Sequence, residues 1–197
     1  MMRSEELVAI AAEQTFPHLL ATGTFFRSWA RFMGCGPTDE IIRDLHRGLE
    51  AKRATGAEIK VPYYLGLLSK AHRSANGAST ALSLLEDALD IVAQTAERWF
   101  EAELHRLRGE ALLKSFEPDH TEDSAEASFR RALEIASRQG AQLWALRAGT
   151  SLAELWRDQG KRQQAQDLLA PIYGWFTEGF DTLDLKEAKS LLNELAR

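Results

Sequence analysis

The sequence predicts an all-α protein built from antiparallel helix hairpins, and three observations carry this prediction. Ala, Leu, Glu, Arg and Gln, which favour helices, are abundant among the 197 residues, while clusters of β-branched residues are nearly absent. Apolar residues recur three and four positions apart within segments of roughly 15–20 residues. Gly and Pro fall between these segments, where one helix would end and the next begin.

Ten helices are expected in chain order. Pro37 and Pro62 fall in expected first turns, where a missing N–H costs little. Thr121, which follows Pro118, is an expected helix start. Four expected helix ends are each marked by a glycine after a polar or basic last turn: Gly56, Gly77, Gly140 and Gly160. The expected helices cover residues 3–14, 16–34, 38–55, 58–75, 78–95, 97–115, 122–139, 141–159, 161–177 and 182–196.

A pattern of three residues recurs along the chain: a small or aliphatic residue, a bulky one four later, and a small or aliphatic one three after that. Its first members are 40, 44 and 40 residues apart, and four extra residues within Phe116–Thr121 account for the longer interval. One helix earlier, a bulky residue follows a mostly small one by three positions. The recurring triplets are Ile41, Leu45, Gly48; Ala81, Leu85, Ala88; Ala125, Phe129, Ala132; and Ala165, Leu169, Ile172. The preceding pairs are Trp29 and Phe32, Ser69 and His72, Gly109 and Leu112, and Ala153 and Trp156.

Each repeat is therefore interpreted as a helical hairpin in which small residues let the two helices approach closely. A hairpin cannot bury both faces alone, so neighbouring hairpins are expected to stack within one domain, residues 1–197. The expected hairpins cover about 16–55, 58–95, 97–139 and 141–177, between an N-terminal helix and a cap at 182–196.

The spacing of small and bulky residues resembles the tetratricopeptide (TPR) consensus, which implies a right-handed superhelix of about four hairpins. The period departs from the 34-residue TPR norm. Trp29 stands where a small residue is usual, and no proline closes the repeats at the usual place.

A more specific resemblance extends over residues 16–197 and is strongest from Ala102 onward. The stretches AERWFEAELH, AELHRLRGEALL and AEASFRRALEIASRQGAQLW are similar to the C-terminal region of bacterial proteins that combine a cyclase-like domain, a signal-transduction ATPase domain and a TPR-like tail. The resemblance implies a regulatory tail in bacterial signalling. A phosphate-binding loop is missing, because Gly160-Lys161 is followed by Arg162 and lacks the upstream glycine.

Composition narrows the classes of function. A net charge of -5 and a pI near 5.6 argue against a nucleic-acid binder. The single cysteine, Cys35, permits no internal disulfide and fits a reducing compartment. The first residues lack the apolar run of a signal peptide, and no stretch is long and apolar enough to span a membrane. A cytoplasmic protein without membrane or nucleic-acid partners is expected.

The sequence shows no group of residues typical of a metal site or a catalytic site. No two of the five histidines are three or four residues apart, so neither a zinc site nor a cofactor is expected. Adjacent acidic pairs are interpreted as solvated helix faces, and a nucleophile-elbow motif is lacking. The sequence therefore favours a non-enzymatic protein.

The TPR resemblance places ten candidate binding residues on the inner, concave face of the first helix of each hairpin. The cations and aromatic rings among them would suit an acidic peptide or carboxylate ligand. The glutamates would instead pair with those cations and leave a groove closed by internal salt bridges, so both interpretations stand. The ten candidates are Phe26, Tyr63, Lys70, Arg73, Glu103, Arg106, Glu110, Arg147, Glu154 and Arg157.

Apolar residues near both ends of the chain are expected either to be packed against neighbouring helices or to be exposed for binding. The aromatic residues between Tyr173 and Phe180 are expected to pack beneath the last helix or to form an exposed docking patch. Leu7, Val8 and Ile10 of the first helix are expected to cover the first hairpin or to leave an apolar face for dimerisation. Three functions follow: a scaffold that binds a protein or peptide, a small-molecule sensor, or a self-association module.

Overall fold

The computed structural model describes residues 2–115 and 122–197, and these residues form helices and their connections without a strand. The ten expected helices are confirmed in this described part of the chain. The four extra residues within Phe116–Thr121, and the helix start at Thr121, lie outside the described residues. The helices are α1 (Met2–Glu13), α2 (Pro17–Cys35), α3 (Asp39–Ala54), α4 (Val61–Ser74), α5 (Ala78–Thr95), α6 (Glu101–Leu112), α7 (Glu122–Arg138), α8 (Gln142–Asp158), α9 (Arg162–Gly174) and α10 (Leu183–Leu195).

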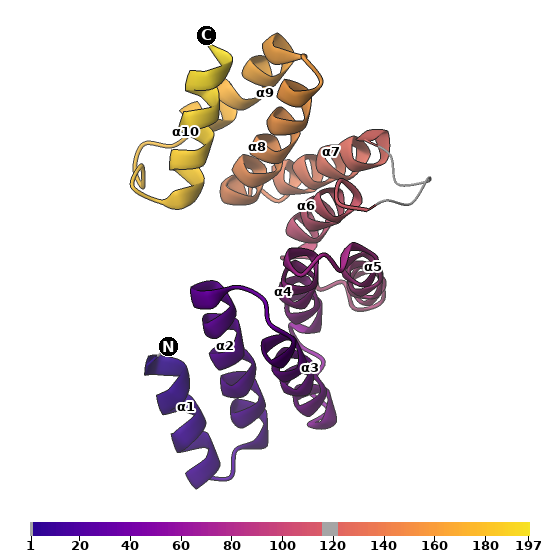
Figure 1. Cartoon of the computed structure of the whole chain (residues 1–197), viewed down its shortest axis with the longest axis vertical. Coiled ribbons are helices and arrows are strands. Elements are labelled where there is room, and N and C mark those ends of the chain that lie inside the picture. The colour runs from indigo at the N-terminus through magenta and orange to yellow at the C-terminus, as the bar shows by residue number, and fades with distance from the viewer. Residues whose placement is uncertain (1, 116–121) are drawn as a thin grey trace. The chain divides into compact units, whose positions relative to one another are not determined.

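The helices fall into two compact units, an N-terminal unit (residues 1–97) and a C-terminal unit (residues 98–197). In the N-terminal unit, α2 pairs with α3 and α4 pairs with α5, while α1 packs on α2 (Figure 1). In the C-terminal unit, α6 pairs with α7 and α8 pairs with α9, while α10 packs on both α8 and α9. The four expected hairpins are therefore all formed.

Helix bounds shift by up to four residues where the backbone turns left-handed before a helix. Lys60 has φ 65°, so α4 begins at Val61 rather than at the expected residue 58. Ala96 has φ 58° and closes α5, so α6 begins at Glu101 rather than at residue 97. Neither non-glycine residue carries a sequence signal for this conformation, since left-handed backbone is usually found at glycine or asparagine.

Two residues predicted to mark helix boundaries do not have the predicted role: Gly77 at the end of α4 and Pro37 in the first turn of α3. The left-handed residue at the end of α4 is Asn76, with φ 60°, and Gly77 instead precedes α5 with φ -92°. Pro37 lies before the first turn of α3, because Thr38 is the N-cap and its Oγ1 accepts a hydrogen bond from the Ile41 N–H at 3.2 Å. Pro62 lies in the first turn of α4, as expected.

The recurring triplets form the core of the hairpins. All twelve members are buried except Ile172, which is half-buried. An added Cβ at Gly109 would lie 2.4 Å from the ring of Phe129, so helices α6 and α7 approach closely there. In the first hairpin Trp29 fills the small position, and the close approach is made instead by Gly48, whose added Cβ would lie 2.9 Å from the Phe25 backbone.

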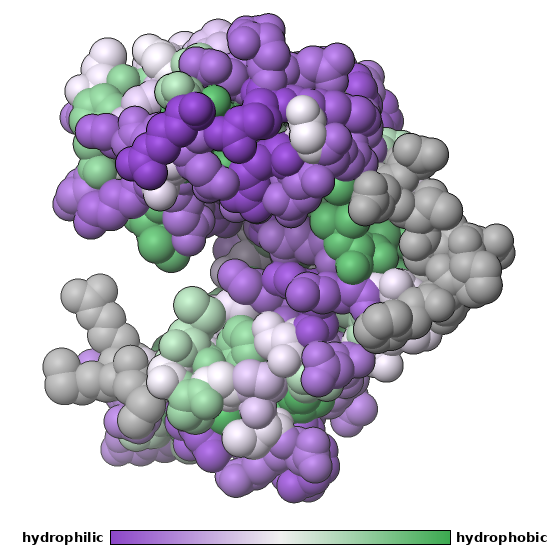
Figure 2. Space-filling model, turned by 45° about the horizontal axis from the view of Figure 1, so that its top comes forward, coloured by the Kyte–Doolittle hydropathy of each residue, from purple (hydrophilic) through white to green (hydrophobic). Residues whose placement is uncertain are grey.

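The faces of the two units that are visible in Figure 2 differ in polarity. Figure 2 shows a mostly hydrophilic face over the C-terminal unit and a paler face over the N-terminal unit, with several apolar side chains. In the described part of the chain, no helix combines the length and hydrophobicity that crossing a membrane requires.

Candidate functional site

The ten candidate residues all lie on the first helices of the hairpins, but they divide between the two units. Four of them form what we call the aromatic surface of the N-terminal unit: Phe26 on α2, and Tyr63, Lys70 and Arg73 on α4. The other six lie in the C-terminal unit: Glu103, Arg106 and Glu110 on α6, and Arg147, Glu154 and Arg157 on α8.

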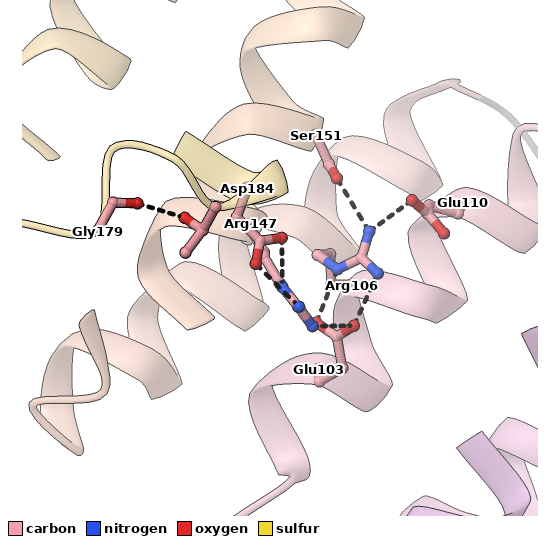
Figure 3. Close-up of polar contacts among 8 residues, drawn as sticks. Glu103, Arg106, Glu110, Arg147, Ser151, Gly179 and Asp184 are labelled. Carbon is pink, nitrogen blue, oxygen red and sulfur yellow. Dashed lines mark hydrogen bonds and ion pairs between the residues drawn. The ribbon is translucent and has the colours of Figure 1, made fainter. Parts of the chain in front are cut away.

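Arg106 is the centre of the polar contacts in the C-terminal unit (Figure 3). Its Nε and Nη2 donate to the two carboxylate oxygens of Glu103 at 2.7 and 2.8 Å, and its Nη1 donates to Glu110 and to Ser151 Oγ. Arg106 and Glu103 are only 8% and 5% exposed. A bidentate pair with further hydrogen bonds is the arrangement that makes a buried charge tolerable.

The pKa of Arg106 reflects this pairing. Burial alone lowers the pKa of the guanidinium, but the hydrogen bonds and negative charges of Glu103 and Glu110 outweigh it and raise the pKa above its usual value. Arg106 therefore carries a fixed positive charge, which the adjoining carboxylates neutralise.

Arg147 extends the polar contacts across three helices. Its Nε and Nη2 donate to Asp184 of α10 at 2.8 and 3.0 Å, and its Nη1 lies 3.6 Å from Glu103 of α6. Its guanidinium also lies over the Trp144 ring, 5.1 Å from the centroid. Together Glu103, Arg106, Glu110, Arg147, Ser151 and Asp184 form the arginine network, which ties α6, α8 and α10 to one another.

Arg157 and Glu154 complete the candidates of this unit. Arg157 pairs with Asp158 at 2.9 Å and with Glu194 of α10 at 3.2 Å, and the hydrogen bond to Asp158 is the main reason that its pKa is raised. Glu154 is exposed. Because every candidate cation of this unit faces a carboxylate, the arrangement is the one that the salt-bridged interpretation predicts.

The aromatic surface has a different character. The rings of Phe26 and Tyr63 lie 6.3 Å apart, and Phe26 lies 5.6 Å from the ring of the buried Tyr64. Phe26 and Tyr63 keep part of their surface in solvent, and burial of the remainder raises the pKa of the Tyr63 hydroxyl. Lys70 lies two helical turns after Tyr63 and has no ion-pair partner among the described residues.

Asp184 and Glu194, the α10 partners of the arginines on α8, are not among the ten candidate residues. A signal was present in the spacing, since Arg147 and Asp184 are 37 residues apart and so are Arg157 and Glu194. The equal spacing shows that α8 and α10 lie in register. The C-terminal helix thus supplies charge partners besides an apolar cap.

The two ends of the chain keep apolar side chains in solvent. Trp175 is 59% and Phe180 47% exposed, so the expectation that these rings pack beneath α10 is wrong for both. They contact aromatic neighbours in their own segment, Phe176 and Tyr173 respectively. At the other end, Ile10 on α1 is 52% exposed.

The first helix covers the first hairpin only in part. An added Cβ on Gly23 of α2 would lie 2.9 Å from Val8 and 3.2 Å from Leu7, so these two residues pack closely against α2. Ile10 does not join them, and Phe16 and Leu19 just beyond are 52% and 42% exposed.

Comparison with known proteins adds one relative. No family model matches the sequence. Over 152 residues the chain is 28% identical to a protein of Rhizobium meliloti (strain 1021) that is described only as uncharacterized. The similarity covers 77% of this chain but 14% of that protein, so the chain spans only a small part of the length of this relative.

Proposed function

We propose that the chain is a non-enzymatic, TPR-like module that binds a peptide segment of another protein on the aromatic surface. The observation that carries this function is the partly exposed contact between Phe26 and Tyr63, on two different hairpins. Lys70, two helical turns further along α4, has no ion-pair partner in the described part of the chain. The arginine network does not offer a comparable site, because its cations are already neutralised.

The chemistry of the surface indicates the kind of peptide. Aromatic rings that are half in solvent gain stability when an apolar or aromatic side chain covers them. The free ammonium of Lys70 favours a carboxylate about two helical turns along α4 from that contact. The ligand is therefore a peptide with an apolar anchor residue and an acidic residue nearby.

The relative supports a modular role. Since the matched stretch is a small part of a far longer bacterial protein, a helical segment of this kind would work beside other domains. Such a segment, stacked as a right-handed superhelix in the cytoplasm, would serve bacterial signalling by recruiting a partner or by contacting a neighbouring domain.

A peptide-display selection on the tag-free chain, followed by fluorescence anisotropy with the selected peptides, tests this function. Phe26→Ala and Tyr63→Ala are each expected to weaken binding at least tenfold, and Lys70→Glu is expected to weaken acidic peptides selectively. Lys189→Glu, on an exposed position of α10, is the matched control and leaves affinity unchanged. Selected peptides that bind all four variants alike would contradict the assignment of the site, and a selection without enrichment would contradict the function.

Self-association is a second candidate function, and the exposure of Ile10, Phe16 and Leu19 favours it. These side chains lie on α1, on α2 and between the two helices, and a second copy of the chain could cover them. Sedimentation velocity over a hundredfold range of concentration tests this candidate. A dimer that Ile10→Glu dissociates would support it, and a monomer at every concentration would exclude it.

A further inference from the structure

Two histidines outside the proposed peptide site face each other in the N-terminal unit. His46 on α3 and His72 on α4 have their Nε2 atoms 2.8 Å apart, with the rings close to perpendicular at 73°. Both side chains are half-buried, so one edge of the pair remains open to solvent. The pair joins the second helix of one hairpin to the first helix of the next.

The repeat itself does not require histidine at either position. His72 is the bulky residue that ends the first helix of its hairpin, and the residue at this position in the fourth hairpin is Trp156. His46 follows the bulky member of its triplet, as Arg130 does in the third hairpin. Arg130 and Trp156 are also 26 residues apart and make a cation–π contact at 5.1 Å. The equivalent junction, between the third and fourth hairpins, therefore packs without imidazole.

We propose that His46 and His72 chelate one divalent transition-metal ion through their Nε2 atoms, with preference for Cu²⁺ or Ni²⁺. With metal–nitrogen bonds of about 2.0 Å, two ligands at a right angle lie about 2.8 Å apart, whereas two ligands of a tetrahedral ion lie about 3.3 Å apart. The observed 2.8 Å fits the right-angled geometry of square-planar and octahedral ions. Tetrahedral Zn²⁺ would require the two helices to separate slightly.

Ion binding requires the transfer of one proton and a tilt of the two rings. In the metal-free pair one Nε2–H donates to the Nε2 lone pair of the other ring, so the two rings are different tautomers. To bind the ion, the donating ring carries its proton on Nδ1 instead of Nε2, and both rings tilt so that their Nε2 lone pairs converge on the metal. Burial and the neighbouring His46 lower the pKa of His72, which favours the neutral, ligating form.

The pair provides two protein ligands, and water fills the other coordination positions. Among the described residues, no group of three or more His, Cys, Asp or Glu side chains is placed to hold an ion. A two-histidine chelate with water ligands binds more weakly than a closed structural site, and it leaves positions open to a ligand from solution.

Titration of the tag-free chain with CuCl₂, followed by electron paramagnetic resonance, tests the site directly. The expected spectrum is that of one Cu²⁺ per chain with hyperfine coupling to two imidazole nitrogens. The number of coupled nitrogens is read from the unmodified chain. Calorimetry should give the affinity order Cu²⁺ above Ni²⁺ above Zn²⁺. Spectra with fewer than two coupled nitrogens, or no binding at millimolar metal, would overturn the proposal.

Variants then assign the ligands. His46→Gln and His72→Gln each keep a hydrogen-bonding side chain, and each is expected to weaken Cu²⁺ binding at least tenfold and to abolish the two-nitrogen spectrum. His18→Gln and His105→Gln are the controls. Each is expected to retain the Cu²⁺ affinity and the two-nitrogen spectrum of the unmodified chain. Circular dichroism in the presence of a chelator checks that each variant is folded. Retention of tight Cu²⁺ binding by a folded His72→Gln variant would place the metal elsewhere.

Discussion

Arg147 on α8 and Asp184 on α10 form a bidentate ion pair, with N–O distances of 2.8 and 3.0 Å. The pair is partly shielded from solvent and holds α10 in register on α8, so it should be stronger than a surface ion pair. We expect Asp184→Asn to destabilise the C-terminal unit by about 1–2 kcal/mol. A double-mutant cycle with Arg147→Gln, measured by urea unfolding, should give a coupling energy of about 1 kcal/mol. A coupling energy of zero would show that this ion pair does not help to hold α10 on α8.

The buried Arg106 should be far more sensitive to substitution than Arg147. Replacing Arg106 with Gln leaves Glu103, which is 5% exposed, without its bidentate partner. Arg147, whose Nη1 lies 3.6 Å from Glu103, compensates this buried carboxylate only in part, so we expect a loss of about 3 kcal/mol in the free energy of unfolding.

The double variant Glu103→Gln/Arg106→Gln isolates the charge effect. It removes both charges while keeping two hydrogen-bonding groups, and its loss of stability should be smaller than that of Arg106→Gln alone. Thermal and urea unfolding of the three proteins measure this difference. A double variant less stable than the single variant would contradict the interpretation that the stranded charge causes the loss.

Gly109→Ala should destabilise the α6–α7 hairpin although alanine is the better helix former. The added methyl group would lie 2.4 Å from the Phe129 ring, which must shift within the core. We expect a net loss of about 1–3 kcal/mol. Gly34→Ala on α2 is the matched control, since an added Cβ there meets nothing within 4 Å and should stabilise by up to about 1 kcal/mol. Equal effects of the two substitutions in chemical unfolding would contradict the close approach.

His105 should make the C-terminal unit less stable in mild acid. Burial, helped by the charges of Arg131 and Arg108, lowers the pKa of its imidazole from 6.5 to about 4. The unfolded chain therefore takes up a proton between pH 6.5 and 4 that the folded chain excludes, so stability falls as the pH falls through this window. We expect a loss of about 1–3 kcal/mol by pH 4, allowing for partial exposure of the ring.

Unfolding measured at pH 7, 6 and 5 tests this linkage. His105→Gln should flatten the dependence between pH 6.5 and 5, where few carboxylates titrate. A variant with the same slope as the unmodified chain would assign the acid sensitivity to other groups.

The hairpins could be predicted from the sequence, because the small, bulky, Gly and Pro residues that define each of them lie within about 40 residues. The recurring triplets predicted which side chains are buried, and all but Ile172 are. Helix starts were less predictable. Lys60 and Ala96 adopt left-handed backbone that their residue types do not favour, and the fold around them must impose it.

By itself, the sequence determined the all-helical class, the pairing of helices into four hairpins, and the close approach of α6 and α7 at Gly109. Local propensity and a fixed spacing of apolar residues are sufficient for these features. Tertiary structure alone decided which charges are neutralised and which rings stay in solvent. His46 reaches His72 only because two hairpins are stacked in register, and Asp184 reaches Arg147 only because α10 packs in register on α8. A side chain acquires such a partner from the neighbouring helix, whose position is set by the packing of the whole unit and not by the residues beside it in the chain.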